Sequence, residues 1–183
     1  MQTKSLRKTT EIAYIALMTA LIAVCAWISI PTTVPFTMQT FAVFVAAGLL
    51  GPRRGVIAVV VYMLLGAAGL PVFNGMQGGL GVLLGRTGGY MVGFIFIALI
   101  EGFTARKTGR RPLPLLLAMI AGTAVCYAFG TAWFMYVYAS TTGPVGLTAV
   151  LGWCVFPFIL PDLCKMLLAL VVIRRVAPHL NLD

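Results

Sequence analysis

Three charged side chains of this sequence stand within or beside long apolar stretches: Arg86, Asp162 and Lys165. One charge at the centre of a membrane-spanning helix costs about 2.5–3.5 kcal/mol on insertion scales, so such residues are paired or hydrated. Asp162 and Lys165 are three positions apart, which puts both on one face of a helix. Pro157 and Pro161 precede them and predict a kink or a helix start at this depth.

Two interpretations of the Asp162–Lys165 pair are open. The pair could be a buried structural salt bridge, or it could line a pocket in which each ion partners the other and a bound solute. Ionisable residues within membrane spans are functional by default. We therefore favour the pocket.

Two amide side chains lie on the same, external side of the predicted membrane domain. Gln39 begins an apolar stretch, and Asn74 belongs to a long glycine-rich loop over residues 71–87. An Asn-Gly pair is typical of a simple turn. The length of this loop and its apolar residues also suit a lid whose backbone approaches a ligand. The aromatic residues on this side are typical of an interfacial belt: Tyr90, Trp133, Tyr136, Tyr138 and Trp153.

The elements that position these side chains are predicted to be transmembrane helices. The 183 residues are 61% hydrophobic and 9% charged, with a mean hydropathy of +1.02, whereas soluble domains carry roughly 25% charged residues. Six apolar segments are expected to span the membrane as helices: residues 12–30, 37–51, 55–70, 88–104, 113–138 and 150–173. The first follows basic residues as a signal peptide does, but we interpret it as a retained helix of one domain covering residues 1–183.

The basic residues predict the orientation. Most of the 13 Lys and Arg residues fall before the first span, after the sixth, or between spans two and three and spans four and five. Six crossings place these positions on one side, which the positive-inside rule assigns to the cytoplasm together with both termini. Glu11 and Glu101 are expected near the cytoplasmic ends of spans one and four. The net charge of +9 therefore indicates a multi-pass plasma-membrane protein and not a nucleic-acid partner.

Small residues form two possible packing faces. Ala16 and Ala20 continue a stripe of alanines along the first span, which could pack within the chain or dock another protein. Gly89 and Gly93 form a similar motif in the fourth span, which we expect to pack within the chain.

The sequence does not favour an enzyme. Its one histidine, His179, lies near the C-terminus, and neither an HExxH nor a GxSxG motif is present. The four cysteines stand alone in apolar stretches and are interpreted as small hydrophobic residues. Residues 79–87 lack the glycine and lysine of a phosphate-binding loop at Leu80 and Arg86. We expect no metal site, no cofactor and no ATP hydrolysis by this chain.

The order and spacing of several segments resemble the BioY family, the biotin-specific S components of energy-coupling-factor (ECF) transporters. These segments are the alanine motif at Ala16 and Ala20, residues 34–40 (VPFTMQT), 46–55 (AAGLLGPRRG), 69–73 (GLPVF), 78–81 (GGLG), 85–90 (GRTGGY) and 161–165 (PDLCK). The resemblance covers nearly the whole chain.

This resemblance implies an all-α, six-helix S-component bundle with an outward-facing biotin pocket under the loop after the third helix. It also implies that Ala16 and Ala20 dock onto a transmembrane coupling protein that carries two cytoplasmic ATPases, which alone use ATP. The S component is thought to topple in the membrane to deliver its vitamin.

Biotin has a ureido group, an apolar thiophane ring and a valerate anion, and the candidate residues match these parts. Asp162 and Asn74, with Gln39, suit the ureido group; Lys165 and Arg86 can offset the carboxylate; and aromatic residues such as Tyr90 can cover the thiophane ring. Two alternatives remain open, an S component for a different vitamin and a stand-alone facilitator for a small solute.

Overall fold

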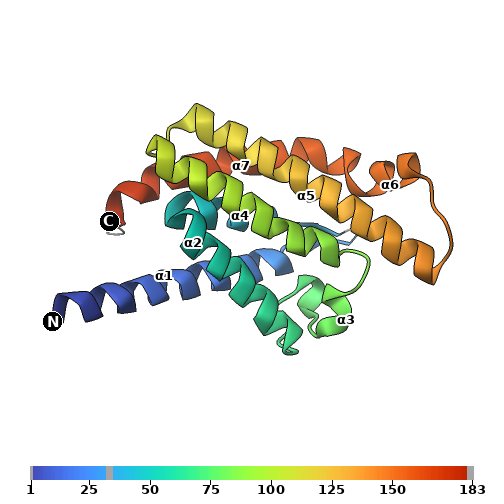
Figure 1. Cartoon of the computed structure of the whole chain (residues 1–183), viewed down its shortest axis with the longest axis horizontal. Helices are drawn as coiled ribbons and strands as arrows, with labels where there is room; N and C mark the ends of the chain where they lie inside the picture. The colour runs from blue at the N-terminus through green and yellow to red at the C-terminus, as the bar shows by residue number, and fades with distance from the viewer. Residues whose placement is uncertain (1, 32–34, 181–183) are drawn as a thin grey trace.

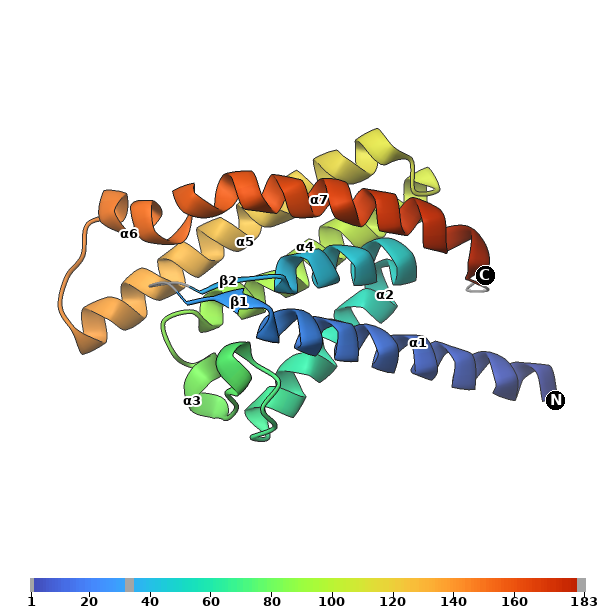
Figure 2. The same ribbon diagram turned by 180° about the vertical axis from the view of Figure 1, so that it is seen from behind.

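The computed structural model describes residues 2–31 and 35–180, with side chains from residue 8 onward. The elements, in chain order, are α1 (Gln2–Trp27), β1 (Ser29–Ile30), β2 (Phe36–Thr37), α2 (Gln39–Ala67), η1 (Asn74–Met76), α3 (Leu80–Leu83), α4 (Gly88–Thr108), α5 (Pro112–Thr141), α6 (Leu147–Cys154), α7 (Phe156–Val176) and η2 (Ala177–His179). The long helices form a bundle in which both termini lie at the same end (Figures 1 and 2). This arrangement agrees with the predicted even number of crossings.

Helix α2 contains two of the six predicted spans, joined without a loop. Gly51 has φ of 76° and ψ of −175°, a conformation that glycine adopts far more readily than other residues. The Nε2 atom of Gln39 donates a hydrogen bond of 2.6 Å to the Tyr62 hydroxyl, although these residues would be about 35 Å apart in a straight helix. Residues 39–50 and 52–67 are therefore two arms that fold back at Gly51, and the six-helix count is confirmed.

The bend in α2 is supported by a side chain from the loop after α4. Pro52 has no N–H with which to bond the carbonyl of Gly48. The Nε of Arg110 donates to that carbonyl oxygen at 3.0 Å, and its Nη2 donates to the oxygen of Leu49 at 3.0 Å. The carbonyls freed by the bend thus have a partner.

Helix α4 packs closely between α2 and α5 because glycines remove side chains from its contacts. A Cβ atom on Gly102 would lie 2.6 Å from the Pro52 backbone, and one on Gly93 would lie 2.5 Å from the Cys126 sulfur. One on Gly89 would lie 2.3 Å from Trp133. The prediction that Gly89 and Gly93 pack within the chain is confirmed.

The sixth predicted span, residues 150–173, is broken into α6 and α7 at Val155. Pro157 lies in the first turn of α7, where its missing N–H costs little. The kink or helix start that Pro157 and Pro161 predict within this span is therefore confirmed.

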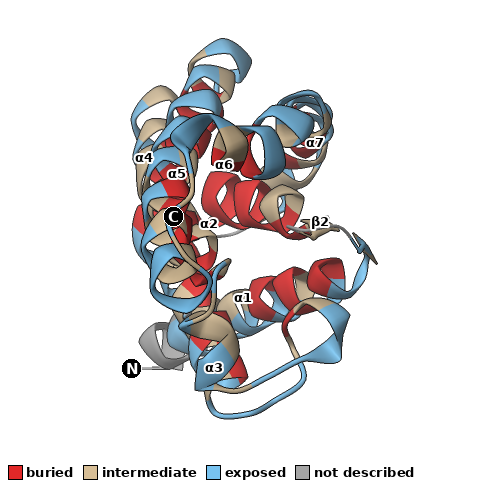
Figure 3. Ribbon diagram, turned by 90° about the vertical axis from the view of Figure 1, so that its right-hand side faces the viewer, coloured by how far each residue is buried: buried red, intermediate tan, exposed pale blue. Residues whose placement is uncertain are grey.

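Helix α1 lies at the edge of the bundle. The hydroxyl of Thr19 donates a hydrogen bond of 3.1 Å to the Ala58 carbonyl in the second arm of α2. Ala16 and Ala20, in contrast, are exposed. The interpretation that this alanine face packs within the chain is therefore wrong for these two residues. Buried residues gather on the inward faces of the helices (Figure 3). Apolar side chains such as Leu17 and Leu160 are exposed, as the lipid-facing surface of a membrane protein requires.

Candidate functional site

A cavity of about 150 Å³ lies at the end of the bundle opposite the termini. Its walls come from the start of α2, the start of α4, the middle of α5, the α6–α7 region and the segment after α2. The lining residues are Pro35, Thr37, Gln39, Thr40, Phe73, Asn74, Gln77, Val82, Thr87, Tyr90, Met91, Phe94, Cys126, Tyr127, Cys154, Phe158, Asp162 and Lys165. The cavity is thus built by segments that are remote in sequence.

The two charges of the cavity form a buried ion pair. The Lys165 Nζ lies 2.8 Å from the Asp162 Oδ1, and the two residues are 5% and 3% exposed. The Thr40 hydroxyl links them, accepting from Lys165 at 3.1 Å and donating to Asp162 Oδ1 at 3.0 Å. The Tyr127 hydroxyl donates to Asp162 Oδ2. Each charge is therefore offset before any ligand binds, as burial in an apolar bundle requires.

This network leaves specific hydrogen-bonding capacity for a ligand. A carboxylate offers about four lone-pair sites, and three donors occupy Asp162, which leaves one site on Oδ2. The Lys165 ammonium donates to two oxygens and lies 4.2 Å above the Phe36 ring centroid, so its third N–H is held only by the weaker attraction to the ring. One acceptor and one donor are thus available side by side.

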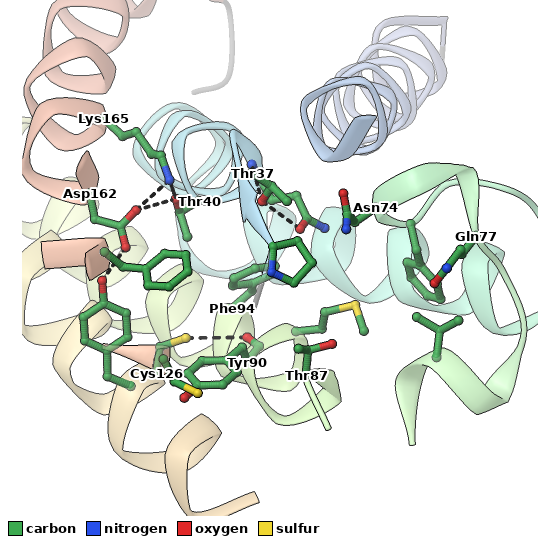
Figure 4. A pocket seen from close by; sticks show the side chains of 18 residues that line it. Thr37, Thr40, Asn74, Gln77, Thr87, Tyr90, Phe94, Cys126, Asp162 and Lys165 are labelled. Carbon is green, nitrogen blue, oxygen red and sulfur yellow. Dashed lines mark hydrogen bonds and ion pairs between the residues drawn. The ribbon is translucent and has the colours of Figure 1, made fainter. Parts of the chain in front are cut away.

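The other end of the cavity carries neutral amides. Gln39 accepts from the Thr37 hydroxyl at 2.9 Å and donates to Tyr62. The Oδ1 of Asn74 is buried and has no hydrogen-bond partner among the described residues. Asn74 and Gln77 lie at the end of the cavity opposite Asp162 and Lys165, with Phe94 and Tyr90 between the two ends (Figure 4). A ligand that is polar at both ends and apolar in the middle would match this arrangement.

The segment between α2 and α4 is ordered over the cavity by contacts at both of its ends. The Trp27 indole donates to the Pro71 carbonyl at 2.9 Å, and the Trp133 indole donates to the Gly85 carbonyl at 3.0 Å. Phe73 is 1% exposed and packs edge-on to Tyr62 with ring centroids 5.5 Å apart. The segment therefore lies over the cavity as expected, and its role as a movable lid stays a prediction.

Five of the six predicted ligand-binding residues line this cavity, namely Gln39, Asn74, Tyr90, Asp162 and Lys165, whereas Arg86 does not. The Arg86 Nη2 donates to the Thr142 hydroxyl at 2.7 Å, and its guanidinium carbon lies 4.7 Å from the Tyr138 ring centroid. Arg86 therefore ties the covering segment to the end of α5. Arg86, which was predicted to offset the biotin carboxylate, is thus not among the residues that line the cavity.

Comparison with known protein families matches residues 1–182 to the BioY family. The chain belongs to the BioY family. A relative from Thermotoga maritima named "Biotin transporter BioY" is 42% identical over 86% of this chain and 89% of its own length. A Pyrococcus horikoshii relative named "Probable biotin transporter BioY" is 36% identical over 92% of this chain and 96% of its own.

A solved structure shares the fold. The crystal structure of the S-component for biotin from an ECF-type ABC transporter superposes with a TM-score of 0.82 and 29% identity, over 93% of this chain and 92% of that one. The helical bundle of this BioY chain is therefore an S-component fold, and the chain is a multi-pass membrane protein.

Several residues that line the cavity or support its lining were missed by the sequence reasoning. Tyr127 and Thr40 complete the coordination of Asp162, and Tyr62 and Thr37 hold Gln39. Thr37 and Thr40 flank Gln39 in a segment already singled out, so their proximity to it was a usable signal. Tyr62 and Tyr127 lie inside apolar spans, where a tyrosine gives no sign of its partner.

Glu101 lies in the second half of α4, towards the cytoplasmic end as expected, but inside the bundle. It is 0% exposed, and neither of its carboxyl oxygens has a hydrogen-bond partner in the described part of the chain. It faces Gly48, where a Cβ would lie 3.0 Å from the Glu101 Oε1. Glu11, in contrast, pairs with Arg54 at 2.6 Å near the surface. The missing side chain of Gly48 on α2 makes room for the Glu101 carboxyl group inside the bundle, a burial that the sequence did not predict.

Proposed function

We propose that this chain captures biotin at the external face of the plasma membrane and delivers it inward as the S component of an ECF transporter. The observation that carries the proposal is the buried Asp162–Lys165–Thr40–Tyr127 network at one end of an apolar cavity that has amides at the other end. Membership of the BioY family and the names of its relatives support biotin over another vitamin.

The ureido group suits the charged end of the cavity. A ureido N–H can donate to the remaining site on Asp162 Oδ2, and the ureido oxygen can accept from the third N–H of Lys165. This pairing uses the one acceptor and the one donor that the network leaves available. Because an ionised partner strengthens both hydrogen bonds, this end supplies most of the specificity.

The apolar and carboxylate parts of biotin follow from that orientation. Tyr90 and Phe94 lie in the middle of the cavity, where they can cover the thiophane ring. The valerate then points to Asn74 and Gln77, whose amide N–H groups can donate to it. In this orientation Asn74 serves the carboxylate, whereas it was assigned to the ureido group from the sequence; both assignments stay predictions.

The decisive experiment is biotin binding to the purified protein in detergent. Asp162→Asn keeps the size of the side chain but replaces the charged acceptor, and we expect biotin affinity to fall about ten- to a thousandfold by calorimetry. Biotin methyl ester should lose affinity for this variant by the same factor as biotin, because the ester leaves the ureido group intact. The control variant is Lys107→Met, because Lys107 is exposed and does not line the cavity; its biotin affinity should equal that of the wild type.

Undiminished affinity in the folded Asp162→Asn variant would remove this network from the binding site. If another vitamin bound more tightly than biotin in the same assay, the chain would be assigned to that substrate instead.

The partner subunits are proposed to be a transmembrane coupling protein and two cytoplasmic ATPases, docked through the exposed face of α1. The support is that Ala16 and Ala20 are exposed although α1 also packs on α2 through Thr19, which leaves a smooth helical surface for another helix. Ala16→Trp should leave biotin binding unchanged and abolish ATP-driven uptake in vesicles that contain all subunits. Uptake by the chain alone in vesicles without ATPases would instead show a stand-alone facilitator.

A further inference from the structure

A second cavity, of about 760 Å³, lies at the end of the bundle that carries both termini. It is bordered by the first half of α1, the bend of α2 and the end of α4. Its lining residues are Glu11, Ile15, Leu50, Gly51, Pro52, Arg53, Arg54, Ile57, Ala105, Arg106, Gly109 and Arg110. The first cavity, which contains Asp162 and Lys165, shares none of these residues.

The charge of this inner cavity is strongly positive. Four guanidinium groups line it against a single carboxylate, Glu11, which pairs with Arg54. Arg110 supports the bend of α2 through two carbonyl oxygens, which do not neutralise its charge. Arg53 and Arg106 are exposed and make no ion pair with any residue whose side chain the structure describes. An anion would therefore be attracted here, and guanidinium groups match a phosphate in shape and hydrogen bonding.

The depth of the cavity places it at the lipid headgroups. Helix α4 has 21 residues, Gly88–Thr108, and is therefore about 31 Å long, close to the roughly 30 Å of a bilayer's hydrocarbon core. Arg106 is in the last turn of this helix, and Arg110 follows it. Both lie on the cytoplasmic side, where anionic lipids attract basic clusters.

An apolar wall completes the cavity. Ile15, Leu50, Ile57 and Ala105 line it beside the arginines. Ile57 and Ile12 of α1 are exposed apolar side chains. A soluble anion would gain nothing from these side chains, whereas a phospholipid would bury its glycerol and the start of its acyl chains against them. The lining combines the two chemistries of one lipid molecule.

We propose that this cavity binds an anionic phospholipid of the cytoplasmic leaflet, with its phosphodiester between Arg53 and Arg106. A zwitterionic headgroup would bring its own cation next to the guanidinium groups, so a headgroup with net negative charge is preferred. The lipid fills the space between α1 and the end of α4 and holds α1 in place on its inner half. The positive-inside rule accounts for arginines on this side, but not for their gathering around one cavity with an apolar wall.

The test measures lipid binding to the detergent-purified chain by native mass spectrometry, using phosphatidylglycerol and phosphatidylcholine with the same acyl chains. The wild-type chain should retain phosphatidylglycerol in preference to phosphatidylcholine. The double variant Arg53→Gln/Arg106→Gln should bind phosphatidylglycerol about 10- to 30-fold more weakly. The matched control Arg174→Gln/Arg175→Gln removes the same charge from exposed positions of α7 on the same side, outside the cavity, and should bind like the wild type.

Three results would overturn the proposal. If the two double variants lost phosphatidylglycerol affinity equally, the lipid would be attracted to the basic surface in general and not to this cavity. If soluble glycerol phosphate displaced bound phosphatidylglycerol as well as the lipid itself does, the cavity would be a site for a free anion. Unchanged lipid binding, combined with lost assembly with the coupling protein in the Arg53→Gln/Arg106→Gln variant, would mean that an acidic protein segment occupies the cavity. An unchanged circular dichroism spectrum and melting temperature verify that each variant is folded.

Discussion

The two ends of the molecule treat charge in opposite ways. At the outer end, the side chains of Asp162 and Lys165 are only 4% and 6% exposed, and a chain of hydroxyl groups satisfies them. At the inner end, the ion pair of Glu11 and Arg54 has side chains that are 43% and 26% exposed. The outer ions are desolvated and depend on one another, whereas the inner ions remain partly hydrated.

This difference shows which charged groups depend on a fixed protein partner and which can be compensated by water, salt or lipid. In a low-dielectric interior, removing one partner leaves a buried ion without compensation, so the protein loses stability by the desolvation cost of that ion. Near the surface, water and salt replace a lost partner at little cost. The outer network therefore sets a rigid pattern of donors and acceptors for a ligand, and the inner cluster can exchange its partners.

The largest effect is expected when the outer pair is broken. Lys165→Met leaves the Asp162 carboxylate buried beside Tyr127 and Thr40, and we expect a loss of about 3–5 kcal/mol, seen as a melting temperature lower by about 10 °C in detergent. The double variant Asp162→Leu/Lys165→Met removes both charges and should recover at least half of that loss. A double variant less stable than Lys165→Met would show that the pair itself stabilises the fold.

A smaller effect of opposite sign is expected at Glu101, between the two ends. Its carboxyl group is buried against Gly48 and Ile173 with no described partner. Glu101→Met replaces an unsatisfied polar group by an apolar one of similar size, so the protein should become more stable by about 1–3 kcal/mol. Glu101→Gln keeps an unsatisfied polar group and should gain less. Thermal unfolding of the two variants tests this, and destabilisation by Glu101→Met would show that the carboxyl group has a stabilising partner.

The spans and their orientation could be predicted from the sequence because both depend on local composition. Apolar stretches, their bordering arginines and Pro157 are visible without knowledge of any contact. The reversal at Gly51 was visible only as a short gap between two spans. Its sharpness depends on a positive φ and on Arg110, which lies 62 and 61 residues from the carbonyl groups it supports.

The candidate site was predicted less completely because its contacts join distant spans. The Asp162–Lys165 pair was predictable from its spacing within one helix, but Thr40 is 122 residues from Asp162, and Tyr127 is 35 residues away. Arg86 was grouped with this pair because a charge on the outer side lacked an explanation. Its actual partners, Thr142 and Tyr138, are uncharged and lie at the end of another helix.

The smallest effect is expected at the inner ion pair. Glu11→Gln removes the negative partner of Arg54, and because both side chains are partly exposed, the loss of stability should be less than about 1 kcal/mol. Raising the salt concentration should reduce even this difference, whereas the effect of Lys165→Met should not depend on salt. Thermal unfolding of Glu11→Gln and the wild type at low and high salt measures both points. A loss for Glu11→Gln as large as that for Lys165→Met would mean that the inner pair is desolvated too, since only a dry environment makes a lost partner so costly.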